Sequence, residues 1–189
     1  MSRWEPNARG RLEQAALDLY QERGFEQTTV AEIAERAGLT ERTFFRYFAD
    51  KREVLFWGQG RLHEIVVNAV ASQPVTASPF NIVVAALEAM AAAVPDRPEF
   101  LQQRQAVIAQ NPELQERELL KMASLIGVIT EALQQRGIPG PTVRLLVETG
   151  IAVYRVAFTR WVDEKEKGPR TLPQLLREAL DELKAVLAF

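Results

Sequence analysis

The stretch Thr28–Lys51, TTVAEIAERAGLTERTFFRYFADK, constrains the fold more than any other part of the sequence. Thr29 and Glu32 have the spacing of a capping box, which predicts that a helix begins there. Gly38 predicts the end of this helix, because glycine adopts the left-handed conformation after a helix without strain. Thr40 can then cap a second helix. The stretch therefore predicts two short helices joined by a tight turn.

Each of these helices has one apolar face. Val30 and Ile33 lie on the first, and Phe44 and Phe48 lie four residues apart on the second. Together with Leu39, we expect these side chains to pack the two helices against each other. The other face of the second helix keeps charged, polar and aromatic side chains, which is the chemistry of a DNA recognition helix.

The outer face can also be interpreted as an ordinary solvated surface, since many helix pairs are joined in this way. Phe45 favours DNA contact, because an exposed aromatic side chain often marks a contact surface. Arg42, Arg46, Lys51 and Arg52 add positive charge within eleven residues. The candidate DNA contacts are Thr29, Thr40, Arg42, Thr43, Phe45, Arg46, Tyr47 and Lys51.

The same stretch resembles the DNA-binding domain of TetR-type (tetracycline-repressor-like) transcriptional regulators. The matching pieces are Gly24-Phe25, Thr28-Thr29-Val30, Ile33-Ala34, Ala37-Gly38-Leu39, Thr43-Phe44-Phe45-Arg46-Tyr47-Phe48 and Asp50-Lys51. The family commonly has T-(L/F)-Y-x-H-F followed by K, so Phe45 and Tyr47 depart from its usual Tyr and His. The close match covers residues 10 to 56, and the rest of the chain is similar in length and helical layout.

Apolar periodicity and chain breaks predict an all-α protein of about nine helices, the layout that the resemblance also implies. We expect an N-terminal three-helix helix-turn-helix domain at 1–50 and a larger helical ligand-binding and dimerisation domain at 51–189. A single helix over 50–72 would start in the first domain and end in the second. The later helices are predicted over 80–94, 99–110, 111–136, 141–163 and 171–189.

The composition limits the function classes. The chain has 189 residues, a net charge of −2 and no cysteine, which excludes disulfides and thiolate metal sites. The first 53 residues carry nine Lys/Arg and ten Asp/Glu, so DNA affinity would depend on local placement of cations and on dimerisation. The sequence contains no long uncharged apolar run and no hydrophobic signal core, so we expect a cytoplasmic protein outside the membrane.

Catalytic chemistry is not indicated. His63 is the only histidine, and the glycine-rich nucleotide-binding and serine-nucleophile motifs are absent from the sequence. A helix residue beside the core is a more common role for such a histidine than catalysis or metal binding. We therefore expect no enzyme, no cofactor and no metal site.

A ligand pocket between the helices of the second domain is implied by the resemblance. Arg104 is a cation on an otherwise apolar stripe, so it could anchor an anionic or carbonyl-bearing effector. Alternatively, its stem packs and its head reaches solvent or pairs with an acid. Met122 can line an adaptable pocket or belong to the core. The candidate ligand contacts are Phe100, Gln103, Arg104, Met122, Ile126 and Tyr154.

The last two predicted helices have wide apolar stripes, which the family would use to pair two copies as a four-helix bundle. The alternative is that both stripes are used within one chain. The candidate interface residues are Val153, Phe158, Trp161, Leu176, Leu180 and Leu183.

These observations predict a homodimeric regulator, with double-stranded DNA and a small hydrophobic effector as partners. We expect a repressor that is released from a palindromic operator by its effector. Two other hypotheses stay open: a small all-α enzyme or binding protein that uses the same cavity, and a DNA-binding protein without a ligand. The sequence does not name the effector, the operator, the regulated genes or the sign of regulation.

Overall fold

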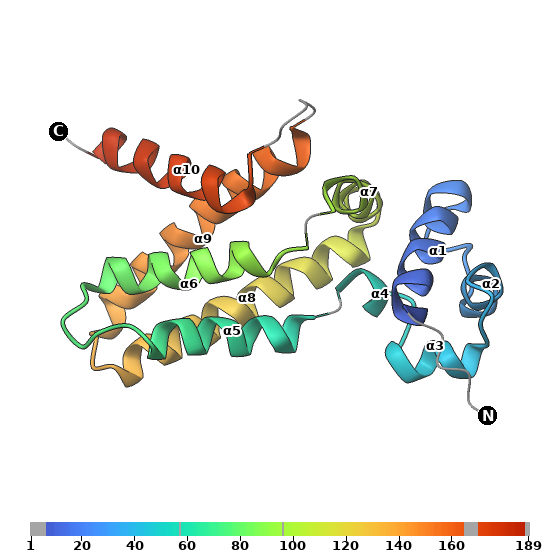
Figure 1. The fold of residues 1–189 in the computed structure, drawn as a ribbon, viewed down its shortest axis with the longest axis horizontal. Coiled ribbons are helices and arrows are strands. Elements are labelled where there is room, and N and C mark those ends of the chain that lie inside the picture. Colours follow the sequence, from blue (N-terminus) through green and yellow to red (C-terminus); the bar gives the residue numbers. More distant parts are fainter. Residues whose placement is uncertain (1–6, 57, 96, 165–169, 188–189) are drawn as a thin grey trace. The chain divides into compact units, whose positions relative to one another are not determined.

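The protein is helical throughout the residues that its computed structural model describes, which are 7–56, 58–95, 97–164 and 170–187 (Figure 1). No β-strand occurs among these residues, so the all-α prediction is confirmed. The helices are α1 (Ala8–Arg23), α2 (Val30–Arg36), α3 (Glu41–Tyr47), α4 (Glu53–Phe56), α5 (Gln59–Ala71), α6 (Pro79–Ala93), α7 (Pro98–Ala109), α8 (Pro112–Gln135), α9 (Gly140–Asp163) and α10 (Leu172–Leu187).

The described residues form two compact units. Unit 1 comes from segments 1–57 and 99–118, and unit 2 from segments 58–98 and 119–189. This division differs from the predicted one, because 99–118 packs with unit 1. The functional boundary between residues 50 and 51 stays a prediction.

The local signals of the helix-turn-helix stretch act as predicted. Thr29 Oγ1 accepts from the Glu32 N–H at 3.3 Å, and the Glu32 carboxylate accepts from the Thr29 N–H at 2.8 Å. Gly38 follows α2 with a φ of 65°, a conformation that favours glycine. Thr40 Oγ1 accepts from the Thr43 N–H at 3.2 Å and caps α3. The two short helices and their tight turn are therefore confirmed.

The apolar faces of α2 and α3 also pack as predicted. Ile33 and Phe44 have no exposed surface, and Phe48 is 2% exposed. Val30 and Leu39 are partly buried against the same core cluster, which includes residues of α1. The inward face of α3 is thus used for packing, which leaves its outer face free.

Residues far along the sequence complete the core of unit 1. Val107 and Ile108 of α7 and Leu114 of α8 are buried in the cluster that holds α1 and α4. A three-helix unit of about fifty residues buries little surface by itself. Segment 99–118 supplies the additional apolar area.

The single helix predicted over 50–72 is wrong. The structure has α4 and α5 in this region, with Gly58 between them at a φ of 91°. Trp57 lies outside the described residues. A left-handed glycine interrupts helical geometry, and apolar periodicity carries no signal for it. The later helices begin and end within two residues of their predicted bounds, apart from 188–189, which are not described.

Unit 2 is built around α6, which packs against α5, α9 and α10, while α9 also packs against α10. A Cβ at Gly150 of α9 would lie 2.9 Å from Val83 Cγ1 and 3.0 Å from Leu87 Cδ1, so glycine permits the close approach of α9 to α6. The guanidinium of Arg136 donates to the Val70 carbonyl at 3.1 Å, near the end of α5. Unit 2 therefore has its own core and its own polar contacts.

Among the described residues, no single helix is long and apolar enough to cross a membrane; only α6 and α7 taken together, across the bend between them, reach that length and composition.

Candidate nucleic-acid interface

The outer face of α3 presents the side chains that the sequence predicted for DNA contact. Arg42, Phe45 and Arg46 are exposed, whereas Thr43 and Tyr47 are half-buried. Phe45 is 55% exposed, although it is one of the large apolar side chains of unit 1. Since α3 is otherwise held by its inward face, these side chains form a continuous exposed surface.

Two threonine hydroxyls at the start of α3 lie next to each other. Thr40 Oγ1 and Thr43 Oγ1 are 3.1 Å apart and share one hydrogen bond. Thr29 is exposed at the start of α2. Helix N-termini with exposed hydroxyls and N–H groups are suited to phosphate oxygens. Whether these threonines contact DNA stays a prediction.

Arg46 and Tyr47 form a pair on α3. Arg46 Nη2 donates to the Tyr47 hydroxyl at 3.1 Å, and the guanidinium carbon lies 4.9 Å from the centre of the Tyr47 ring. The tyrosine hydroxyl accepts in this hydrogen bond, so its own O–H stays available as a donor. The pair can therefore present a guanidinium and a phenol side by side to an anion or a base edge.

Lys51 has a structural role that the sequence did not predict. Its ammonium group donates to the carbonyls of Phe25 at 2.8 Å, Glu26 at 3.1 Å and Thr28 at 3.0 Å. Its own carbonyl accepts from the Tyr20 hydroxyl at 2.6 Å, and burial raises the pKa of Tyr20, which keeps this hydroxyl protonated. All three N–H groups of Lys51 are used inside unit 1, and its predicted phosphate contact stays a prediction.

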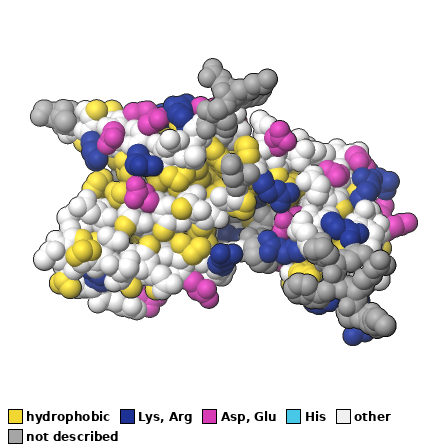
Figure 2. All heavy atoms as spheres, viewed as in Figure 1, with side chains coloured by type: hydrophobic (Ala, Val, Ile, Leu, Met, Phe, Trp, Pro, Cys, Tyr) yellow, Lys and Arg dark blue, Asp and Glu magenta, His cyan; other side chains and the backbone are white. Residues whose placement is uncertain are grey.

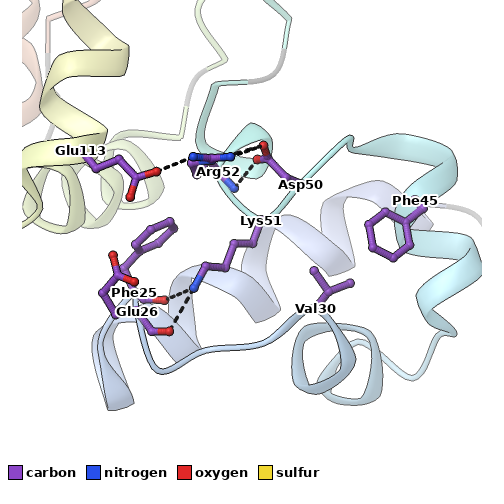
Figure 3. Close-up of a pocket in the computed structure, with 8 residues that line it drawn as sticks. All are labelled: Phe25, Glu26, Val30, Phe45, Asp50, Lys51, Arg52 and Glu113. Carbon is purple, nitrogen blue, oxygen red and sulfur yellow. Dashed lines mark hydrogen bonds and ion pairs between the residues drawn. The ribbon is translucent and has the colours of Figure 1, made fainter.

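A pocket of about 350 Å³ lies beside α3 (Figure 3). Phe45 lies on one side of it and Glu113 on the other, while Lys51 crosses between them. The lining residues are Phe25, Glu26, Val30, Phe45, Asp50, Lys51, Arg52 and Glu113. Glu113 was not predicted as part of this site, because no local pattern connects it to residues more than sixty positions earlier.

The predicted ligand contacts are divided between the two units. Phe100, Gln103 and Arg104 belong to unit 1, whereas Met122, Ile126 and Tyr154 belong to unit 2. The ligand assignments stay predictions.

Arg104 behaves as the packing alternative describes. Its Nε donates to the Leu55 carbonyl at 2.5 Å, and its Nη1 donates to Glu118 at 2.9 Å. Its guanidinium carbon lies 5.1 Å from the centre of the Phe56 ring. Burial lowers the pKa of Arg104, and the Glu118 carboxylate opposes this effect. The cation is thus engaged within unit 1.

The predicted dimer contacts are largely buried in a single chain. Trp161 and Leu180 are each 4% exposed, and Leu176 has no exposed surface. Val153 is also buried, while Phe158 and Leu183 are half-buried. Most of these side chains therefore pack within the chain, and the assignment of this set to a dimer interface stays a prediction.

Exposed apolar side chains do remain on α9 and α10. They are Leu145, Val156, Val186 and Leu187. Figure 2 shows hydrophobic side chains at the surface of unit 2, including a strip between α6 and α10, and charges of both signs interspersed on unit 1.

Two short helices joined by a tight turn, with the outer face of the second one exposed, define a helix-turn-helix unit. The sequence model described as bacterial regulatory proteins, tetR family, matches residues 13–56. A second model, described as the MftR C-terminal domain, matches residues 77–188, which is more than half of the chain. The chain belongs to the tetR family. Its family is one of bacterial regulatory proteins.

Known proteins agree with this assignment. The HTH-type transcriptional regulator TcmR of Streptomyces glaucescens is 35% identical over 88 residues, or 47% of this chain and 39% of TcmR. Thermus thermophilus FadR, a TetR family repressor solved with lauroyl-CoA, is 24% identical with a TM-score of 0.55 over 93% of each chain. A TetR-family regulator from Syntrophomonas wolfei is 15% identical with a TM-score of 0.64, over 95% of this chain and 94% of its own. The structural likenesses show the fold.

Proposed function

We propose that this chain is a homodimeric repressor that binds a palindromic operator through α3 and is released by a small hydrophobic effector. The observation that carries the proposal is the exposed outer face of α3, where Phe45 and the Arg46–Tyr47 pair lie together on a helix whose other face is buried. Arginine can bind guanine with two hydrogen bonds, and an aromatic ring can contact a thymine methyl group. Sequence-specific contact through this face is the function that the geometry supports best.

Arg46→Ala tests this assignment. If Arg46 reads a guanine, the variant loses about 1–3 kcal/mol of binding free energy on its preferred duplex, and the preference relaxes at one base position. The measurement is fluorescence anisotropy with a duplex selected from random sequence. Arg61→Ala on α5 is the control, because it removes an exposed arginine from unit 2. Equal affinity of the folded Arg46 variant and wild type would exclude this role.

The net charge of the chain and the geometry of a palindromic operator both favour a dimer. A chain with a net charge of −2 has little general attraction to DNA, so a single recognition helix would bind weakly. Two copies that read half-sites about 34–36 Å apart gain from both contacts. The apolar side chains still exposed on α9 and α10 support a second copy as the partner that covers them.

The dimer prediction can be tested on these exposed residues. Val156 is 46% exposed on α9, so Val156→Glu should separate the dimer while the chain stays folded. Sedimentation of wild type should give a dimer at micromolar concentration, and that of the variant a monomer. Leu180→Glu is unsuitable, because Leu180 is 4% exposed and the substitution would disrupt unit 2. A monomeric wild type would contradict the proposal.

The proposed effector is a small hydrophobic molecule. The ligand-binding domain of the family supports it, and His63 on α5 adds a specific observation. His63 Nε2 is buried without a hydrogen-bond partner among the described residues. A buried polar atom of this kind is satisfied when a ligand or water supplies the partner. Release of a selected duplex on titration with small molecules would identify the effector.

A further inference from the structure

Four charged side chains connect α4 with the start of α8 inside unit 1. Arg52 and Glu53 are adjacent and opposite in charge, while Glu113 and Arg117 are one helical turn apart on α8. Arg52 Nη1 donates to Glu113 Oε1. Arg117 Nε donates to Glu53 Oε1 at 3.1 Å. Arg52 and Glu53, at the start of α4, therefore each pair with the residue of opposite charge on α8.

The first of these pairs reaches the turn that follows the recognition helix. The Asp50 carboxylate accepts from the Arg52 N–H at 2.8 Å and the Glu53 N–H at 3.0 Å. It also accepts from Arg52 Nε at 3.2 Å, so Arg52 lies between Asp50 and Glu113 (Figure 3). Burial raises the pKa of Asp50, but the hydrogen bonds from Arg52 and Glu53 outweigh it and hold that pKa below its usual range. Asp50, Arg52 and Glu113 are thus joined by a continuous set of hydrogen bonds.

Buried side chains lie beneath these ion pairs. Leu114 of α8 has no exposed surface, and Val54 and Leu55 of α4 are buried in the same cluster. The polar contacts therefore join two helices that both contribute side chains to one core cluster. Surface ion pairs contribute little to stability, and Arg52 and Glu113 are 40% and 50% exposed, so their larger effect is on orientation.

We propose that Glu113 and Arg117 are positioning residues for DNA recognition, which hold the turn at 49–52 and through it the C-terminal end of α3. This inference rests on the proposed function. α8 is one helix from Pro112 to Gln135, and its residues after 118 belong to unit 2. α8, rather than the predicted helix over 50–72, is therefore the continuous element shared by both units.

Variants that remove one charge distinguish a positioning role from a general electrostatic effect on DNA binding. Glu113→Gln removes a negative charge, so a field effect alone would tighten DNA binding, and Arg117→Gln would weaken it. Positioning predicts that both variants bind a selected duplex about fivefold more weakly, or worse. The slope of log affinity against log salt should stay at the wild-type value, because neither residue contacts a phosphate.

A matched control exists in the same unit. Glu22 pairs with Arg36 through two hydrogen bonds of 2.8 and 2.9 Å and is 48% exposed, close to the exposure of Glu113. Glu22→Gln removes the same charge and one exposed pair, but it does not touch the turn at 49–52. We expect this variant to bind DNA as tightly as wild type or more tightly.

Rescue by exchange completes the test. The double variant Glu53→Arg/Arg117→Glu reverses the charges of one ion pair and should return the affinity for DNA to within about twofold of wild type. The single variant Arg117→Glu should not return it. Thermal unfolding establishes that each variant is folded at the assay temperature. Glu113→Gln binding as tightly as Glu22→Gln would overturn the inference. If wild type itself selects no duplex, the proposed function fails instead, so the two failures are distinguishable.

Discussion

Leu114→Ala is expected to destabilise unit 1 by about 2–5 kcal/mol, although Leu114 follows the helix-turn-helix stretch by more than sixty residues. Leu114 has no exposed surface and belongs to the core cluster that contains Leu12, Ile33 and Phe44. Alanine favours helix at least as much as leucine, so the loss would come from packing rather than from helix propensity. Hydrogen exchange of α1–α3 amides, together with urea unfolding, measures the effect.

Leu119→Ala is the control for this prediction. Leu119 lies on the same helix and is 63% exposed, so its truncation should change stability by no more than about 0.5 kcal/mol. If the α1–α3 amides are equally protected from hydrogen exchange in both variants, segment 99–118 does not contribute to the core of unit 1. That result would also remove the basis for placing Glu113 and Arg117 against α4.

Lys51→Met is expected to destabilise unit 1 by about 1–3 kcal/mol in the absence of DNA. Methionine keeps the apolar stem but removes the three hydrogen bonds that the ammonium group donates to the carbonyls of Phe25, Glu26 and Thr28. Those carbonyls lie in the segment that joins α1 to α2. Loss of the three hydrogen bonds should therefore lower the protection of amides in both helices from hydrogen exchange. Urea unfolding of the free protein measures it.

The same variant distinguishes two roles for Lys51. If Lys51 binds a phosphate, its replacement would lower the salt slope of DNA binding by about one unit and leave the stability of the free protein unchanged. Arg42→Met is the matched control, because Arg42 is exposed on α3 and its loss should affect DNA binding alone. Unchanged unfolding of the Lys51 variant, with a lower salt slope, would mean that Lys51 serves DNA rather than the fold.

The parts of the fold that could be predicted have local signals. Thr29 and Glu32 lie three residues apart, and Gly38 and Thr40 mark the turn within a few residues. The apolar period of α3 likewise separates buried Phe44 from exposed Phe45. Each of these features depends on interactions within one or two helical turns, which a sequence pattern records directly.

The break between α4 and α5 could not be predicted in this way. Gly58 is compatible with a helix in sequence terms, and apolar periodicity does not indicate its left-handed φ of 91°. The membership of Leu114 in the core of unit 1 is non-local, since its apolar character fits either unit. Tertiary packing decides where Leu114 is buried.

The candidate site shows the same limit. Lys51 could be assigned to a phosphate from its place in the motif, but its carbonyl acceptors lie 23 to 26 residues earlier and have no side-chain signature. The apolar stripes of α9 and α10 predicted packing faces but not what covers them, because packing within a chain and packing between copies use the same residue types. Leu176 and Leu180 are buried within a single chain, and the dimer interface stays a prediction.

The most direct test of the central claim is selection of DNA by the intact protein from a library of randomised duplexes. We expect enrichment of one two-fold symmetric sequence, with half-site centres about 34–36 Å apart, and loss of that enrichment in a folded variant carrying Phe45→Ala and Arg46→Ala. Failure of the folded wild-type protein to enrich any sequence would mean that this chain is not a sequence-specific DNA-binding protein. The same enrichment by the double variant would contradict the role assigned to α3.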